Sequence, residues 1–141
     1  MSVLPDGDFG ERVRTRLRDE RLIWLTTVGD DGTPQPNPVW FLWDGGESIL
    51  VYNLTSARRL YHIDARPQVA LNFHTNAGGG DVVVLTGTAH HAPATPPPNE
   101  NSGYTAKYGR AMEEVSGSVE AFAAAYSVPV EIDIRRVRGH R

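Results

Sequence analysis

Two adjacent arginines, Arg58 and Arg59, lie where a predicted strand runs into a predicted short helix. The segment that contains them reads Tyr52-Asn53-Leu54-Thr55-Ser56-Ala57-Arg58-Arg59. Hydroxyl groups, guanidinium groups and the free N–H groups of a helix N-terminus all attract anions, and an arginine can grip a phosphate bidentately. One interpretation of the segment is therefore a phosphate site. The other is purely structural, with Ser56 capping the helix and both arginines solvated.

Three further polar residues are candidates either for contact with a ligand or for a solvated surface. Asn72 and His74 alternate along a predicted strand and therefore share one of its faces. That face either approaches a bound phosphate at the mouth of a pocket or meets solvent. Lys107 lies in a predicted helix, where it either contacts an acidic ligand or is a surface lysine.

The histidines and nucleophiles form no pattern typical of a metal or catalytic site. His90 and His91 are neighbours on a predicted strand, so their side chains point in opposite directions, and neither they nor His62 have a carboxylate at ligand spacing. No Ser–His–Asp order stands out either. We therefore expect no bound metal, and we assign no catalytic side chain.

The composition is that of an ordinary globular domain. The 141 residues carry a formal net charge of −3, 40% of them are hydrophobic, and none is cysteine. This length predicts a single domain, residues 1–141, that can bury a core. The charge argues against a nucleic-acid partner, and the lack of a long apolar run or a signal pattern argues against a membrane partner and for a cytoplasmic location.

The elements that must position these residues are mostly strands joined by tight turns. Hydrophobic periodicity predicts helices over residues 8–20, after Arg59, and near 102–114 and 118–126. Strands are expected over residues 22–28, 34–43, 48–54, 69–74, 81–91 and 129–138, with hairpin turns at 29–32 and 44–46. Six mainly antiparallel strands predict a mainly β fold, a barrel or sandwich with short inserted helices.

Prolines, a glycine and two tryptophans refine this outline. Prolines at 34, 36 and 38 require the second strand to be an edge strand or to be bulged near its start. Gly87, inside the long fifth strand, predicts a bulge or a close backbone contact. Trp40 and Trp43 are three residues apart on a predicted strand, so one should enter the core and the other can border a pocket or an interface.

In this order the elements resemble the split β-barrel family of pyridoxamine 5'-phosphate oxidase-like proteins, and most closely its actinobacterial branch of deazaflavin-dependent oxidoreductases. The resemblance covers residues 9 to 139. It is carried by Leu25-Thr26-Thr27-Val28, Asp31-Gly32-Thr33-Pro34-Gln35-Pro36, Pro38-Val39-Trp40-Phe41, Arg66-Pro67-Gln68-Val69-Ala70-Leu71-Asn72-Phe73, Tyr104-x-x-Lys107-Tyr108, Tyr126-Ser127-Val128-Pro129-Val130 and Arg136-Val137-Arg138-Gly139.

The resemblance implies a homodimer whose two chains share each cofactor at their interface. It places the tricyclic ring of the cofactor against the strand around residues 37–41 and its phosphate-bearing tail on the turn at 55–59. Many deazaflavin-binding relatives have a lysine where this chain has Arg59, so the choice of cofactor stays open. The cofactor-binding residues expected on this basis are Asn37, Pro38, Val39, Trp40, Tyr52, Asn53, Thr55, Ser56, Arg58, Arg59, Asn72 and Lys107.

The function that the resemblance implies is an oxidoreductase that binds coenzyme F420, the deazaflavin. It would transfer a hydride from the reduced cofactor to a small conjugated acceptor, with the redox chemistry belonging to the cofactor. One alternative is an FMN-dependent reductase or oxidase of the same fold. Another is a flavin- or deazaflavin-binding protein that performs no turnover.

Overall fold

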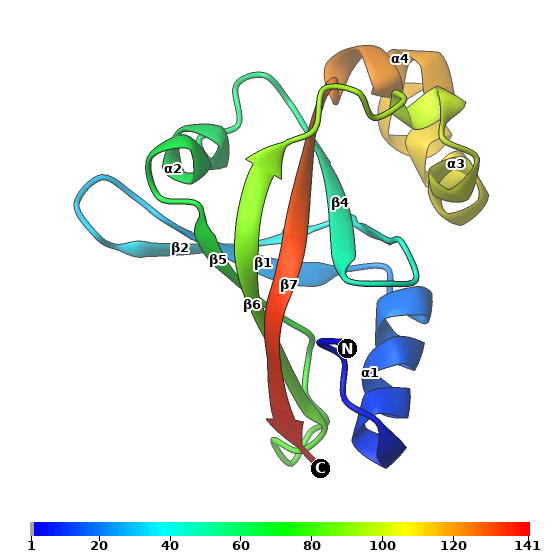
Figure 1. Ribbon diagram of the computed structural model, residues 1–141. Coiled ribbons are helices and arrows are strands. Elements are labelled where there is room, and N and C mark those ends of the chain that lie inside the picture. Colours follow the sequence, from blue (N-terminus) through cyan, green and yellow to red (C-terminus); the bar gives the residue numbers. More distant parts are fainter. Residues whose placement is uncertain (1) are drawn as a thin grey trace.

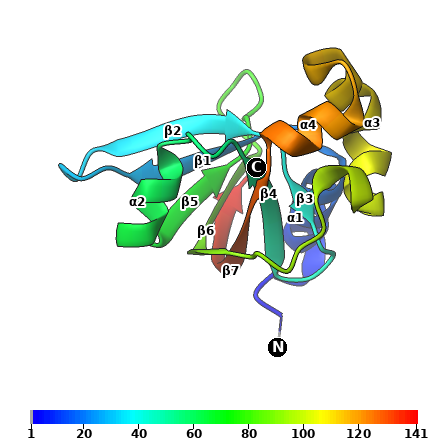
Figure 2. The same cartoon turned by 90° about the horizontal axis from the view of Figure 1, so that it is seen from above.

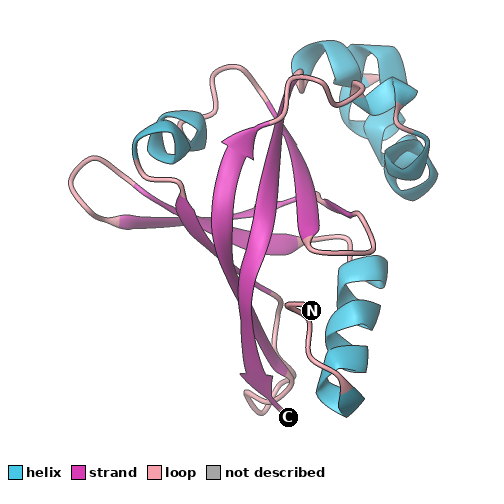
Figure 3. Cartoon of the chain, in the orientation of Figure 1, coloured by secondary structure: helices cyan, strands magenta, loops and turns pink. Residues whose placement is uncertain are grey.

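A curled antiparallel sheet of seven strands forms a half-open barrel with four short α-helices around it (Figures 1 and 3). The computed structural model describes residues 2–141. The strands are β1 Ile23–Val28, β2 Pro34–Val39, β3 Leu42–Trp43, β4 Ser48–Asn53, β5 Gln68–Asn72, β6 Val82–His91 and β7 Val128–His140. The helices are α1 Gly7–Asp19, α2 Arg59–Ala65, the 3-10 helix η1 Pro98–Glu100, α3 Ser102–Ser116 and α4 Val119–Ala125.

The sheet order is β2-β1-β5-β6-β7-β4-β3, which confirms the predicted mainly β fold. Alternating residues of the strands turn inward, and Leu71, Leu85 and Ile132 are completely buried on that face. Helix α1 adds Val13 and Leu17, both also completely buried, to the same core. Among residues 2–141 no helix is long and apolar enough to cross a membrane.

The expected strand over residues 34–43 is two strands at opposite ends of the sheet. β2 pairs only with β1, and β3 pairs only with β4, so the chain crosses the open side of the barrel at Trp40 and Phe41. The edge position predicted from the prolines is confirmed, but the single continuous strand is wrong. Trp40 and Trp43 still pack in different places, Trp40 with the aromatic residues of α3 and α4 and Trp43 against the main core.

The backbone carbonyl groups of the three β2 prolines point away from the neighbouring strand β1, toward the free edge of the sheet. The Gly29 N–H donates to the Thr33 carbonyl. In this register the odd-numbered residues of β2 are the ones that form backbone hydrogen bonds with β1. Pro34, Pro36 and Pro38 therefore direct their backbone groups away from β1. Because proline has no N–H, the outer edge of β2 offers three carbonyls and no donors at these positions.

Gly87 allows the two longest strands, β6 and β7, to stay paired along their whole length. Their register shifts between Thr86 and Gly87, which confirms the predicted bulge. A Cβ atom at Gly87 would lie 2.2 Å from the carbonyl oxygen of Asp133, so no larger residue fits there without moving the backbone.

Helices α3 and α4 carry a second apolar cluster beside β4. Tyr104, Tyr108, Met112 and Phe122 pack against β4 residues Leu50 and Tyr52. Each helix begins at a side-chain cap, since Asn101 accepts from the Tyr104 N–H and Ser118 from the Ala121 N–H. Seen from above in Figure 2, this helical pair and α2 lie on opposite sides of the molecule, and β2 runs past α2.

Candidate functional site

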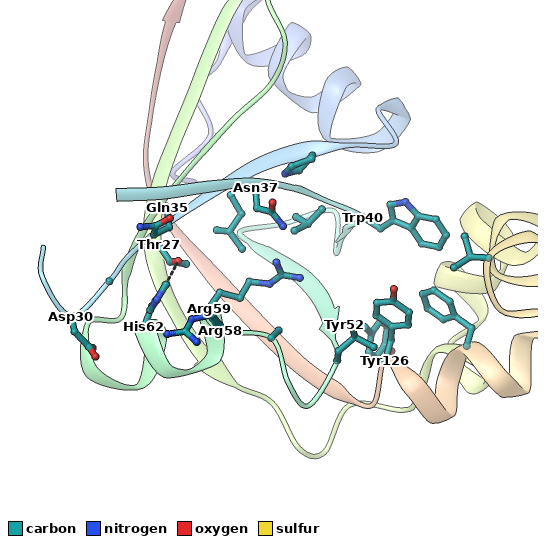
Figure 4. Close-up of a pocket in the computed structure, with 18 of the residues that line it drawn as sticks. Thr27, Asp30, Gln35, Asn37, Trp40, Tyr52, Arg58, Arg59, His62 and Tyr126 are labelled. Atoms are coloured by element: carbon teal, nitrogen blue, oxygen red, sulfur yellow. Dashed lines mark hydrogen bonds between the residues drawn. The ribbon is translucent and has the colours of Figure 1, made fainter. Parts of the chain in front are cut away.

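A cavity of about 1030 Å³ opens between the β1–β2 hairpin, helix α2 and the α3–α4 pair. Its volume is at the upper end of the roughly 300–1,000 Å³ typical of small-molecule sites. Figure 4 shows its two different ends, with Arg58, Arg59 and His62 toward one and Trp40, Tyr52 and Tyr126 toward the other. We call them the cationic end and the aromatic end.

At the cationic end Arg59 is held by a buried amide. Its Nε donates to Asn53 Oδ1 at 2.6 Å. Asn53 is only 1% exposed, and its Nδ2 donates to the carbonyls of Val51 and Val128, each at 3.0 Å. The amide is thereby fixed between β4 and β7, and it orients the guanidinium, whose two Nη groups make no hydrogen bond to residues 2–141. Burial lowers the pKa of Arg59, while the neighbouring Tyr126 acts in the opposite direction.

Arg58 is the second cation of this end. Its side chain is exposed, lines the cavity, and forms neither an ion pair nor a side-chain hydrogen bond with any residue that the structure describes. Helix α2 begins at Arg59, and its N-cap is Arg58 with no side-chain cap. The structural interpretation in which Ser56 caps the helix is therefore wrong.

The middle of the cavity is walled by edge strand β2. Asn37, Pro38 and Val39 line it, and Gln35 joins them from the same face of the strand as Asn37. Figure 4 shows the Gln35 and Asn37 side chains on the cavity side of β2. Amide groups at this wall can donate and accept hydrogen bonds along the edge of a planar ligand.

The aromatic end is a stack of rings. The Trp40 ring lies parallel to Tyr108 at 4.8 Å and close to parallel with Phe122 at 5.3 Å between centroids, and Phe122 in turn stacks on Tyr126 at 4.3 Å. Such a wall suits a flat conjugated ligand.

The tyrosine hydroxyls at this end differ in their partners. Tyr52 donates to the Pro96 carbonyl and accepts from Asn101, whereas Tyr108 donates to the Arg21 carbonyl and accepts from the Phe41 N–H. The Tyr104 hydroxyl makes no hydrogen bond within residues 2–141, although Tyr104 is 1% exposed and lines the cavity. Burial raises the pKa of Tyr104, so its hydroxyl stays protonated and can donate to a ligand.

Of the twelve residues expected to bind cofactor, the structure brings seven together around the cavity. These are Asn37, Pro38, Val39, Trp40, Tyr52, Arg58 and Arg59. Asn53 lies behind Arg59 as its anchor, and Thr55 and Ser56 are exposed in the turn outside the cavity lining.

Asn72 and Lys107 lie away from the cavity of this protomer. Asn72 Nδ2 donates to the Phe73 carbonyl at 3.4 Å. Lys107, the only lysine of the chain, donates from Nζ to the Phe41 carbonyl at 3.0 Å and lies 3.8 Å from the centroid of the Phe41 ring. Burial, aided by the nearby Arg21, lowers the pKa of Lys107 to about 8. It borders a separate groove beside α1 and Trp43.

Several cavity residues were missed by sequence reasoning. Thr27 and His62 line the cavity and are joined by a hydrogen bond of 2.8 Å between Thr27 Oγ1 and His62 Nδ1. The position of His62, four residues after Arg58, was a usable signal, because residues i and i+4 share a helix face. The sequence contains no comparable signal for Thr27, because its surroundings are those of any residue in a buried strand.

One group of possible metal ligands lies outside the cavity, on neighbouring strands. His90 is opposite Glu131 in the β6–β7 ladder, and Asp133 lies beside them, with the ligand-type atoms within 4.8 Å of one another. The expectation that His90 lacks a nearby carboxylate is therefore wrong, because cross-strand neighbours are distant in the sequence. His90 Nε2 contacts Asp133 at 3.3 Å and Arg135 lies 3.9 Å from the same carboxylate, so contacts between exposed polar side chains account for the group.

A family model for pyridoxamine 5'-phosphate oxidase matches residues 9–141, nearly the whole chain. The protein belongs to this family. Membership agrees with the curled antiparallel sheet, which is the split barrel of pyridoxamine 5'-phosphate oxidase-like proteins. No curated protein matches the chain.

Solved structures with the same fold carry several different names. One described as an F420 reductase is 21% identical, with a TM-score of 0.63, and the match covers 95% of this chain and 98% of that one. A Clostridium acetobutylicum protein related to general stress protein 26 is 12% identical, with a TM-score of 0.67 and coverage of 93% and 88%. General stress protein 26 from Bacillus anthracis is 18% identical, with a TM-score of 0.66 and coverage of 90% and 89%. At these identities the likeness establishes the fold alone.

Proposed function

We propose that this member of the pyridoxamine 5'-phosphate oxidase family is an oxidoreductase that uses coenzyme F420 to reduce a small conjugated acceptor. The observation that carries the proposal is the combination, in one cavity, of a cationic end, an amide-bearing strand wall and an aromatic end. These three surfaces match a phosphate-bearing tail, the polar edge of a tricyclic ring and a flat acceptor.

The donor set at the cationic end fits the phosphodiester of this cofactor. Arg59 uses only Nε to reach Asn53, and Arg58 has no partner among the described residues, so both guanidinium groups can bind phosphate oxygens. Asn37 and the main chain of β2 would orient the ring, while Trp40 and Tyr126 exclude water from its neighbourhood. When bound, reduced F420 supplies the hydride, and the Tyr104 hydroxyl can donate a hydrogen bond to the acceptor.

The proposal includes a homodimer in which a second copy covers the cavity. Residues 30–38 are all exposed in the protomer, although residues of this stretch form a wall of the cavity. Leu54 and Val115 also line the cavity and are 38% and 58% exposed. Apolar side chains exposed around an open ligand site are typical of a surface that a partner covers. A cytoplasmic location without nucleic-acid or membrane partners stays a prediction of the sequence.

An FMN-dependent reductase or oxidase is the second candidate. The family to which the chain belongs is named for a pyridoxamine phosphate oxidase, and Arg58 and Arg59 would hold the FMN phosphate equally well. The volume of about 1030 Å³ leaves room for the longer tail of F420 as well as for FMN. A binding protein without turnover would use the same surfaces.

Titration with both cofactors separates these functions. We expect the purified protein to quench F420 fluorescence saturably and to bind F420 more tightly than FMN. We also expect the absorbance of oxidised F420 to appear when a conjugated acceptor is added to protein and reduced F420. Tighter binding of FMN would favour the second candidate, and F420 binding without oxidation by any acceptor would favour a storage protein.

A further inference from the structure

We propose that His62 is a third anion-binding side chain at the cationic end, donating from Nε2–H to a phosphate ester, and that Thr27 is the residue that positions it. The proposal rests on the proposed function in one respect, namely that a phosphate-bearing ligand occupies the cavity. It adds a donor that neither the sequence pattern nor the two arginines supply.

The contact between Thr27 and His62 joins two elements. Thr27 comes from β1 and His62 from α2, and Oγ1 and Nδ1 are 2.8 Å apart. Thr27 is only 2% exposed, so its hydroxyl is withdrawn from bulk solvent. Figure 4 shows this hydrogen bond as the dashed line beside Arg58 and Arg59. The imidazole is therefore held in one orientation at the cavity wall.

The burial of Thr27 also decides which nitrogen of His62 carries the proton. Within residues 2–141 the only hydrogen-bond partner of the Thr27 hydroxyl is Nδ1 of His62. If Nδ1 were protonated, it would donate to Thr27 and leave the buried hydroxyl hydrogen without an acceptor, at a cost of roughly 1–3 kcal/mol. The favoured arrangement has Thr27 donating to Nδ1, so the neutral imidazole carries its hydrogen on Nε2.

That Nε2–H is available to a ligand. It makes no hydrogen bond to any residue that the structure describes, and an added Cβ on Gly29, at the cavity wall, would lie 3.6 Å from it. Along α2, His62 follows Arg58 by four residues and Arg59 by three, so the three side chains share one helix face. A phosphate ester has several acceptor oxygens, so it can receive hydrogen bonds from the guanidinium groups and from the imidazole N–H together.

Two carboxylates on the neighbouring hairpin do not neutralise the attraction of the cationic end for an anion. Asp30 pairs with Arg66 at 2.9 Å and its side chain is 96% exposed, so solvent screens its charge. Asp31 accepts a hydrogen bond of 2.9 Å from the Thr33 N–H, which lowers its pKa and engages its carboxylate within the turn. The cationic end thus keeps its three donors.

The first test reads the tautomer directly. Long-range ¹H–¹⁵N correlation spectra of the ¹⁵N-labelled protein at about pH 8 distinguish a protonated Nε2 from a protonated Nδ1. We expect His62 to carry its hydrogen on Nε2 and the Nε2 resonance to shift saturably as inorganic phosphate is added. A hydrogen on Nδ1, or an Nε2 resonance that phosphate leaves unchanged, would overturn the proposal.

A set of variants then separates positioning from folding. We expect His62→Ala to weaken phosphate binding about tenfold or more, the loss for one hydrogen bond to a charged group. Thr27→Val should weaken it as well and mix the tautomers of His62, whereas Thr27→Ser, which keeps the hydroxyl, should preserve both. His74→Ala, at an exposed histidine outside the cavity, is the control and should bind phosphate like the unchanged protein.

The outcomes distinguish this proposal from the cofactor assignment. If phosphate acts on His62 but F420 does not bind, the phosphate site stands and the proposed function fails. If F420 binds equally well to the unchanged protein and to a folded His62→Ala variant, the proposed function stands and the role of His62 is refuted.

Discussion

At the scale of single residues, the side chains at the cationic end are held by contacts between residues that lie far apart in the sequence. Arg58 and Arg59 were recognisable because two cations follow a strand directly. The anchor role of Asn53 was not, because it depends on the carbonyl of Val128, which lies 75 residues away in the sequence. The pairing of Thr27 with His62 spans 35 residues and was hidden for the same reason.

Substitution of Arg59 tests how much its guanidinium contributes to binding the phosphate of the cofactor. We expect Arg59→Ala to weaken F420 binding by roughly 1.5–3 kcal/mol, the range for a hydrogen bond to a charged group. The free energy of unfolding should also fall, by about 1–3 kcal/mol, because the variant leaves the buried Asn53 Oδ1 without its side-chain donor. Fluorescence titration measures the first quantity and urea denaturation the second.

The matched control for this variant is Arg135→Ala, which removes the same charge from a side chain that is 64% exposed and lies on β7 outside the cavity. Its F420 affinity should equal that of the unchanged protein. Equal losses in both variants would mean that the net charge of the protein, rather than the grip of Arg59, determines binding.

The free energy of unfolding should depend on pH through the partly buried amine of Lys107. Burial lowers its pKa from 10.5 to about 8, so below about pH 8 the folded chain carries a charged, partly desolvated amine. As the pH rises from 8 toward 10.5, the folded state loses this proton before the unfolded state does. The folded state then no longer holds a charged, partly desolvated amine, so it becomes more stable relative to the unfolded state. We expect the free energy of unfolding to increase over this window relative to Lys107→Met, as measured by urea denaturation at several pH values. Parallel profiles for the two proteins would contradict this expectation.

At the scale of elements, local patterns were reliable and the division of one strand was not. Periodicity correctly predicted α1, and the Asp-Gly turns correctly predicted the hairpins around β1 and β4. The break at Trp40 and Phe41 was missed because both flanking segments read as strand. What separates them is the closure of the barrel, which sends β2 and β3 to opposite ends of the sheet, and no local preference encodes that.

The bulge at Gly87 offers a test of one element. A methyl group there would lie 2.2 Å from the Asp133 carbonyl oxygen, so the backbone of β6 or β7 must move. We expect Gly87→Ala to lower the free energy of unfolding by about 1–3 kcal/mol, as overpacking does. Gly109→Ala is the control, since its added Cβ lies no closer than 3.6 Å to Thr105 and alanine favours the interior of α3. Thermal denaturation should show a lower midpoint for the first variant only.

At the scale of the whole molecule, the number of strands and the tight turns between them predicted the fold class, whereas the order of the strands depends on contacts between distant segments. β7 lies between β6 and β4, which places the last strand of the chain in the interior of the sheet rather than at an edge. The cavity follows from this arrangement, because α2 and the α3–α4 pair can then approach β2 from different sides. No short motif predicts such a cavity, because its walls come from segments that are distant in the sequence.

The assembly of two copies can be tested without any ligand. We expect light scattering at micromolar concentration to give the mass of a dimer. Val115→Glu should shift it toward the monomer, because this side chain is 58% exposed at the cavity. Leu22→Glu changes an apolar residue that is 44% exposed but does not line the cavity, and it should remain dimeric. A monomer mass for the unchanged protein would refute the shared-cavity proposal.

The three prolines of β2 also rule out one form of association, the pairing of this edge strand with a strand of another molecule. An added strand needs alternating donors and acceptors along the edge it joins, and the outer side of β2 presents only carbonyls at Pro34, Pro36 and Pro38. Two molecules therefore cannot fuse their sheets along this strand, and the strand cannot nucleate a growing fibril. If the proposed homodimer forms, a newly made chain can leave β2 uncovered until a second copy binds, because its exposed edge is already protected from aggregation.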